Sequence, residues 1–251
     1  MTRPLWIEVA LLSALCAIAA ATLASVPGNW GWSWDALNHH VYLGHISGTQ
    51  RWQLDVMAAN VQSLQYPYLY WPVALLAQSP LSGAQAAALW GATLTLLLVP
   101  PLWLLAWRLL PQQGHPAQAV FERGAATLLG LSSMVVIAGL GTTANDPLAT
   151  VPLLWAIAWM AEPQASDRRA ALAAALWGVS VAFKLSNVLA LPLLLVWWWR
   201  GLPRPLPLRR GWGIALGAAA GYGLAYAPWG VQLWAWSGNP FYPLFDSFFR
   251  P

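Results

Sequence analysis

Charged residues are scarce in this chain. Asp, Glu, Lys and Arg together make up 8% of the 251 residues, whereas 59% are hydrophobic. Ordinary soluble domains are about 25% charged, so this composition excludes a conventional soluble protein. Cysteine and lysine each occur once, as Cys16 and Lys184. A lone cysteine forms no internal disulfide, so no such cross-link contributes to the fold.

The basic residues are spread between long apolar runs. The net charge of +4 comes from 12 basic and 8 acidic residues, and this spacing argues against a nucleic-acid surface and a nucleic-acid partner. Runs close to the ~20 apolar residues that cross a bilayer cover residues 5–27, 84–110, 124–142, 147–161, 170–184, 187–199 and 212–234. The sequence therefore predicts an all-α polytopic membrane protein, a single module over residues 1–251 with about seven transmembrane helices.

The arginines predict the orientation, because positive residues prefer the cytoplasmic side of a membrane. With a cytoplasmic N-terminus, nine of the 12 basic residues fall at cytoplasmic ends or loops. These nine are Arg3, Arg108, Arg123, Arg168, Arg169, Arg200, Arg204, Arg209 and Arg210. Only Arg51, Lys184 and Arg250 then lie on or near the far side.

Two stretches allow a second interpretation. Residues 170–199 could form one helix, but a single crossing would export the basic loop 200–210, so we expect two short segments with a break near residues 184–187. Residues 5–27 could be a cleaved signal peptide. That run is long for such a signal and carries Glu8 where positive charge is expected, which favours a retained span.

The long loop between the first two spans, residues 28–83, is predicted to face the extracytoplasmic side. Short amphipathic pieces at 41–43 and 56–59 predict helices within it. Its tryptophans, Trp30, Trp32, Trp34, Trp52 and Trp71, are typical of the membrane–water interface. We expect this loop to lie as helices on the outer membrane surface.

Asp35, His39 and His40 stand out within this loop. Asp35 and His39 are four residues apart and share one face of a helix. They could simply be polar residues of a polar loop, or they could form a functional site. A metal site of all three is disfavoured, because adjacent histidines point in different directions on a helix.

A second polar group, Asn145 and Asp146, follows the third predicted span. Asp146 precedes Pro147 and could serve only as a helix N-cap. An acidic residue at the rim of a membrane bundle could also line a polar cavity. The two roles are compatible.

Lys184 lies at the predicted break between two short segments. It could extend its ammonium to the interface, or it could bind an anion in a water-filled cavity. A lysine is a compact point charge for phosphate, and Ser186 and Asn187 could add hydrogen-bond donors.

The predicted topology places these carboxylates, histidines and the lysine on the same side. A carboxylate there can accept a proton from an incoming hydroxyl or bind a divalent cation. A cation offsets the charge of a leaving phosphate. The set suits transfer of a group from a lipid-linked phosphate donor.

The layout resembles the N-terminal part of the membrane glycosyltransferases of the GT-C fold, such as protein O-mannosyltransferases and bacterial aminoarabinose transferases. The resembling segments are residues 34–40 (WDALNHH), 144–147 (ANDP), 178–186 (GVSVAFKLS) and 237–246 (SGNPFYPLFD). The resemblance implies a bacterial inner-membrane enzyme that uses a polyprenyl-phosphate sugar donor, and no certain cofactor.

By this resemblance, Asp35 activates the acceptor, Asp146 is a second acidic residue of the site, and Lys184 contacts the donor phosphate. His39, His40 and Asn145 are further candidates for substrate binding, and a divalent cation on Asp146 is an alternative. Family members have later spans that this sequence does not contain, so a protein partner could complete the fold.

Two other functions fit the composition. The chain could be a non-catalytic subunit of a membrane complex, because its tryptophans and small-residue surfaces suit helix and lipid contacts. It could also be a transporter, which a broken helix would allow, but it lacks the paired half-motifs of such proteins.

Overall fold

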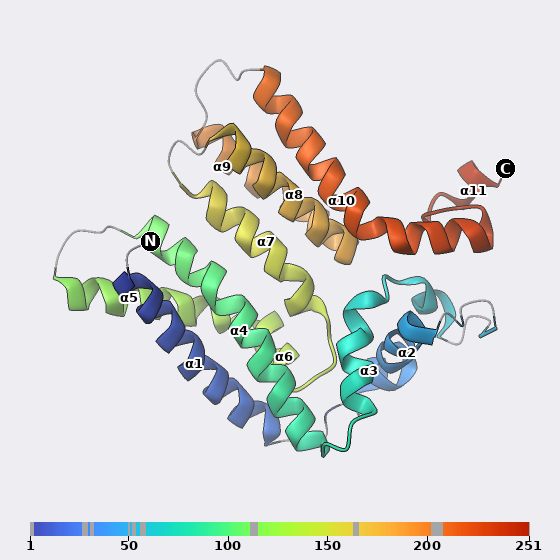
Figure 1. Ribbon diagram of the computed structural model, residues 1–251, viewed down its shortest axis with the longest axis horizontal. Coiled ribbons are helices and arrows are strands. Elements are labelled where there is room, and N and C mark those ends of the chain that lie inside the picture. The colour runs from blue at the N-terminus through green and yellow to red at the C-terminus, as the bar shows by residue number, and fades with distance from the viewer. Residues whose placement is uncertain are drawn as a thin grey trace.

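The chain is described here by a computed structural model, covering residues 3–26, 30, 33–49, 51, 54–55, 59–110, 115–162, 166–201 and 208–250. Every regular element within these ranges is a helix (Figure 1), which confirms the all-α class. The α-helices are α1 (Arg3–Ser25), α2 (Val41–Thr49), α3 (Trp71–Ala77), α4 (Gly83–Leu109), α5 (Pro116–Leu131), α6 (Met134–Leu140), α7 (Asp146–Met160), α8 (Asp167–Phe183), α9 (Leu191–Gly201), α10 (Leu208–Ser237) and α11 (Asp246–Phe249).

Helices occupy all seven stretches that were predicted to cross a membrane. Two of them, α1 and α4, are long and apolar enough to do so, and α5 with α6 makes a third if the pair counts as one span. The apolar stretches in α7 and in Leu185–Val196 are shorter than a standard span. Length and composition therefore identify two or three candidate spans among the described residues, fewer than the predicted seven.

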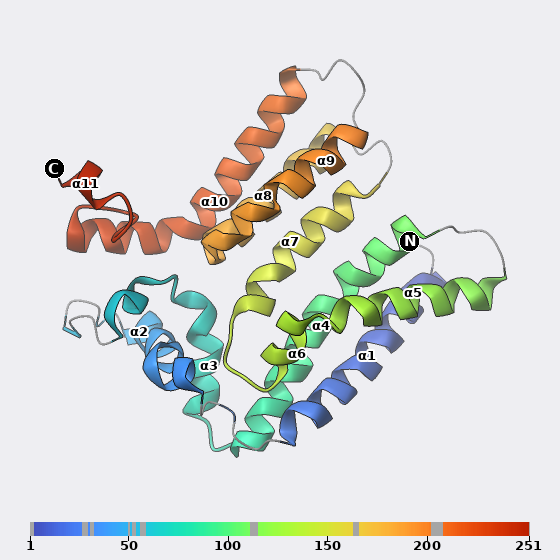
Figure 2. The same cartoon turned by 180° about the vertical axis from the view of Figure 1, so that it is seen from behind.

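The third predicted span, residues 124–142, is not one straight helix. α5 and α6 meet at an angle of 72°, and α5 runs across α1 and α4 (Figures 1 and 2). Ser132 and Ser133 occupy the break, and the Ser132 hydroxyl donates a 2.7 Å hydrogen bond to the Leu129 carbonyl. Serine side chains that bond the backbone compete with helical hydrogen bonds, a feature that apolar content does not reveal.

The bundle is built on α4, which packs against α1 on one side and α7 on the other. The N-terminal end of the bundle is held by a buried ion pair in which Arg123 lies 2.6 Å from Glu8, while the Trp103 indole donates a 2.7 Å hydrogen bond to the same carboxylate. Glu162 pairs there with both Arg108 and Arg169. The described arginines that the sequence assigns to the cytoplasm therefore include three that pair with acidic residues at this end.

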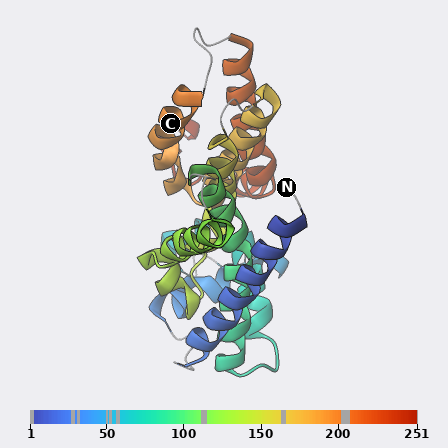
Figure 3. The ribbon, with the colours of Figure 1, turned by 90° about the vertical axis from the view of Figure 1, so that its left-hand side faces the viewer.

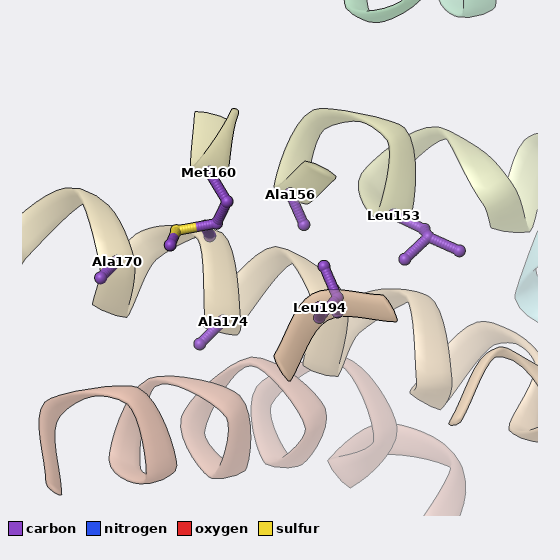
Figure 4. Packing of buried hydrophobic residues seen from close by; sticks show 7 residues of the cluster. Leu153, Ala156, Met160, Ala170, Ala174 and Leu194 are labelled. Carbon is purple, nitrogen blue, oxygen red and sulfur yellow. The ribbon is translucent and has the colours of Figure 1, made fainter. Parts of the chain in front are cut away.

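α7, α8 and α9 share a core of small and aliphatic side chains (Figure 4), in which Leu194 packs with Met160, Ala170 and Ala174. Met160 is the last residue of α7 and Ala170 lies in the first turn of α8, so the two helices run antiparallel. The helix breaks at Lys184, and Leu194 of the following α9 packs into the same core. The predicted break is therefore present, whereas the two membrane crossings of residues 170–199 stay a prediction.

Among the described helices, α8 and α10 share the most extensive contact. A Cβ atom added to Gly221 would lie 2.0 Å from the Ala175 carbonyl oxygen, and one added to Gly217 would lie 2.3 Å from that of Ala171. Gly178 faces Ala218 in the same way, at 2.2 Å. Small residues let helix backbones approach closely in apolar surroundings, so these glycines pack within the chain.

The described part of residues 28–83, which we call the outer loop, folds into a helical cap over one end of the bundle. Its Leu43, Ile46 and Tyr70 are buried against Trp229 and Leu233. These last two follow Pro228, which lies inside α10. This helix is bent along its length (Figures 1 and 3). The predicted helix at 41–43 is therefore real, whereas residues 56–58, Trp32 and Trp52 lie outside the described residues.

Candidate functional site

An ion pair between Lys184 and Asp146 joins the C-terminal end of α8 to the N-terminal end of α7. Asp146 is the first residue of α7, and Lys184 directly follows α8 with an extended backbone (φ −150°, ψ 109°). The two side chains are 43% and 36% exposed, respectively. The antiparallel packing of α7 and α8 thus brings together residues that are 38 positions apart.

The N-cap interpretation of Asp146 is wrong. The N-cap position of α7 is occupied by Asn145, whose side chain makes no capping hydrogen bond, and Pro147 is the second helical residue rather than the first. The Asp146 carboxylate instead receives the Lys184 ammonium. A helix terminus alone therefore does not account for this acidic residue.

The helix break is held by Asn187. Its side-chain amide donates a 2.7 Å hydrogen bond to the Ser180 hydroxyl and a 3.2 Å bond to the Ala149 carbonyl, and Ser180 donates to that same carbonyl at 2.8 Å. The Asn187 donors are thus used between helices, contrary to the expectation that they serve a bound anion. They fix the start of the turn that carries Lys184.

Lys184, Asn145 and Ser186 line a cavity of about 530 Å³, which we call the aromatic cavity. Its aromatic lining comes from the outer loop, the end of α8, α10 and the C-terminal segment: Tyr66, Phe183, Tyr222, Tyr226, Trp229, Phe241, Tyr242 and Phe245. Cavities of 300–1,000 Å³ with apolar walls and a few polar groups are typical of small-molecule sites. The aromatic cavity has this character.

The sequence analysis did not identify Tyr222 and Tyr226 as part of the site. Their rings stack at 5.2 Å, and Tyr226 stacks in turn on Phe241 at 5.7 Å. The spacing of four residues places both tyrosines on one helix face. This spacing is the feature of the sequence from which the pair could have been predicted. The cavity wall itself depends on the bend of α10.

Residues 241–245 of the 237–246 motif form part of the wall of the aromatic cavity. Asn239 is fully buried and holds the segment folded, because its side chain donates to the Leu244 carbonyl at 2.8 Å and accepts from the Phe241 amide at 2.9 Å. Phe245 has a positive φ of 56°, a conformation that non-glycine residues seldom adopt. The asparagine of the motif is thus structural.

His40 connects the outer loop to the turn before α7. Its Nδ1 lies 2.7 Å from the Thr143 hydroxyl, and its ring stacks on Tyr70 at 4.7 Å. Burial lowers the pKa of His40 to about 4; His39 acts in the same direction, and the carboxylates Asp35 and Asp146 oppose it. His40 is therefore neutral at pH 7 and lies within electrostatic reach of Asp146.

The two histidines lie closer together than the sequence suggested. The His39 and His40 rings touch edge to face at 4.4 Å, because residues Ala36–His40 form a π-helical turn, which is wider than an α-helical one. The expectation that they point apart is wrong. No group of three His, Cys, Asp or Glu side chains within the described ranges is placed to hold a metal ion.

Asp35 lies beside His39, as the four-residue spacing predicted, with its carboxylate 3.9 Å from His39 Nδ1. Asp35 is 58% exposed, whereas His39 is buried and its pKa is lowered by burial and raised by Asp35. Of the predicted site residues, Lys184 and Asn145 line the aromatic cavity, Asp146 pairs with Lys184, and the others lie behind them in the outer loop.

No described protein family matches this chain, and neither a curated protein nor a solved structure matches it. The site therefore rests on its own geometry: a lysine–aspartate pair at a helix break, a neutral histidine pair beside it, and an aromatic cavity that the lysine lines.

Proposed function

We propose that this protein transfers a sugar from a polyprenyl-phosphate donor to an acceptor at the extracytoplasmic face of a bacterial inner membrane. The main observation behind this proposal is that Lys184, which pairs with Asp146, lies on the wall of the aromatic cavity. A cationic group beside an aromatic, partly enclosed space suits a ligand that combines phosphate, sugar and an apolar tail.

Lys184 binds the donor phosphate in this proposal. Its pair with Asp146 is more than one-third exposed on both sides, and such pairs contribute only about 0–1 kcal/mol. The ammonium can therefore turn from Asp146 to a phosphate oxygen at small cost. As the sugar–phosphate bond breaks, Lys184 offsets the charge on the leaving lipid phosphate.

The acceptor oxygen attacks the anomeric carbon, and its proton passes to a carboxylate. Asp35 takes this role, because its carboxylate is 58% exposed and therefore accessible to an acceptor. Asp146 orients Lys184, while Asn145, His39 and His40 provide polar contacts for the substrates. The reaction produces a glycosylated acceptor and polyprenyl phosphate.

This function requires a topology in which the Lys184 end of the bundle is extracytoplasmic. The proposal therefore includes a cytoplasmic N-terminus and seven crossings, four of which use helices shorter or less apolar than a standard span. Shielding by neighbouring helices allows such segments at membrane depth. Arg108, Arg123 and Arg169 lie together at the opposite end of the bundle, and this cluster of positive residues supports the orientation.

The test is sugar transfer by the purified protein in liposomes, with a panel of polyprenyl-phosphate hexoses, pentoses and aminosugars. Release of polyprenyl phosphate is measured for the wild type, Lys184→Ala and Asp35→Asn. We expect each variant to lose at least about 100-fold in rate while inserting normally. Arg51→Gln is the control, because it removes an exposed cation from the outer loop, which also carries Asp35. This variant should keep full activity.

Full activity in both variants would refute the mechanism. If the wild type transfers no sugar but co-purifies in a fixed ratio with another membrane protein, the subunit interpretation replaces the enzyme.

A further inference from the structure

A second cavity, of about 600 Å³, lies at the end of the bundle that carries the arginines. We call it the tryptophan cavity. It lies on α4 between α1 and α7, and its indole rings come from Trp6, Trp103, Trp107, Trp155 and Trp159. Tryptophan prefers the membrane–water boundary, where an apolar ring meets polar headgroups. The proposed function makes no use of this cavity.

The polar end of the tryptophan cavity carries a net positive charge. Glu162 lies 2.8 Å from an Arg108 terminal nitrogen and also pairs with Arg169, so two guanidinium groups share one carboxylate. The Arg108 side chain is only 10% exposed, and its Nε has no hydrogen-bond partner among the described residues. One positive charge therefore remains unbalanced beside an apolar wall.

Buried cations need a partner, because removing a charge from water is costly unless the charge is paired. Guanidinium groups fit the planar pairs of oxygens that phosphates present. Basic pockets between membrane helices on the cytoplasmic side are typical sites for anionic lipid headgroups. An inorganic anion would satisfy the charge, but it would leave the wall of five indole rings unused.

We propose that the tryptophan cavity binds an anionic glycerophospholipid. Its phosphate lies against Arg169 and Arg108, and the upper part of its acyl chains lies along Trp155 and Trp159, whose rings are 6.4 Å apart. Trp6 is 60% exposed and leaves the cavity accessible from the lipid side of α1. The lipid is a bound component of the bundle and takes no part in sugar transfer.

Binding is measured by native mass spectrometry of the detergent-solubilised protein with phosphatidylglycerol, phosphatidylcholine or inorganic phosphate. We expect retention of phosphatidylglycerol and little of phosphatidylcholine, and we expect inorganic phosphate not to displace the lipid. Arg169→Gln should weaken binding about 10-fold. Glu162→Gln should tighten it, because it frees both arginines.

The matched control is Arg168→Gln. Arg168 neighbours Arg169 on the same helix but is exposed and does not line the cavity, so its loss should leave binding unchanged. Equal loss in both arginine variants would overturn the proposal in favour of a general surface charge. Equal retention of the two lipids would also overturn it, and displacement by inorganic phosphate would identify a free-anion site instead.

A second measurement does not depend on the charged residues. Phosphatidylglycerol with brominated acyl chains should quench indole fluorescence more than brominated phosphatidylcholine, and Trp155→Phe should reduce that difference. Quenching that is identical for the two lipids would contradict a specific site.

Discussion

Gly221→Ala should separate α10 from α8. The added Cβ would lie 2.0 Å from the Ala175 carbonyl oxygen, 2.6 Å from its carbonyl carbon and 2.8 Å from its Cα, whereas ordinary contact begins at 3.4 Å. All three obstructing atoms belong to the backbone, so no change of side-chain rotamer relieves the clash. The helices must move apart by about 1.4 Å (3.4 − 2.0) at this point.

Two opposing effects set the magnitude. Overpacking a tight interior costs about 1–3 kcal/mol, and the upper end applies because the obstacle is backbone. Alanine is better than glycine within a helix by about 1 kcal/mol. The net destabilisation is therefore about 2 kcal/mol.

Gly223→Ala is the matched control, because it lies two residues further along α10 and a Cβ there meets nothing within 4 Å. It gains the helix preference without the clash and should be about 1 kcal/mol more stable than the wild type. The assay is equilibrium unfolding in mixed micelles, followed by circular dichroism. If Gly221→Ala proves as stable as Gly223→Ala, α8 and α10 do not pack as described.

Two further predictions concern the outer loop and the topology. Acidification from pH 7 to pH 5 should destabilise the loop by about 2 kcal/mol. The reason is that burial lowers the pKa of His40 from 6.5 to about 4 in the folded protein, so protons bind the unfolded chain preferentially. The stability that neutral His40 contributes is complete above pH 6.5 and is lost as the pH falls towards 4. Hydrogen exchange over residues 33–49 should show this loss, and His40→Gln should reduce it, whereas an unchanged pH response in that variant would refute the role of His40. The topology is tested with single cysteines at the exposed residues Thr49 and Gln118, in a Cys16→Ser background. An impermeant maleimide is added to the outside of intact, right-side-out spheroplasts. Thr49→Cys should be labelled and Gln118→Cys should not; labelling of both from outside would exclude the proposed orientation.

Local sequence features predicted several elements correctly because they depend on nearby residues. Long apolar runs required helices, and no described residue forms a strand. The break at Lys184 was predicted from the expectation that the basic residues 200–210 stay on the cytoplasmic side, which implies that the chain turns back before them. The Asp35–His39 proximity followed from a four-residue spacing alone.

Other features depend on how distant segments pack, and a single sequence does not encode them locally. The bend between α5 and α6 has only two serines as its signal, so apolar content suggested one span. The role of Asp146 was decided by Lys184, 38 residues away, because α8 returns antiparallel to α7. The closeness of the two histidine rings required a π-helical turn that no propensity indicates.

The sequence by itself determined the helical class, since scarce charges and long apolar runs leave few other arrangements. Only the tertiary structure decided the site. The aromatic cavity exists because the end of α8, α10, the outer loop and the C-terminal segment come together in space. Glycine contacts between α8 and α10 hold the two helices close enough for that cavity to form, and such contacts are set by shape complementarity between segments far apart in the chain.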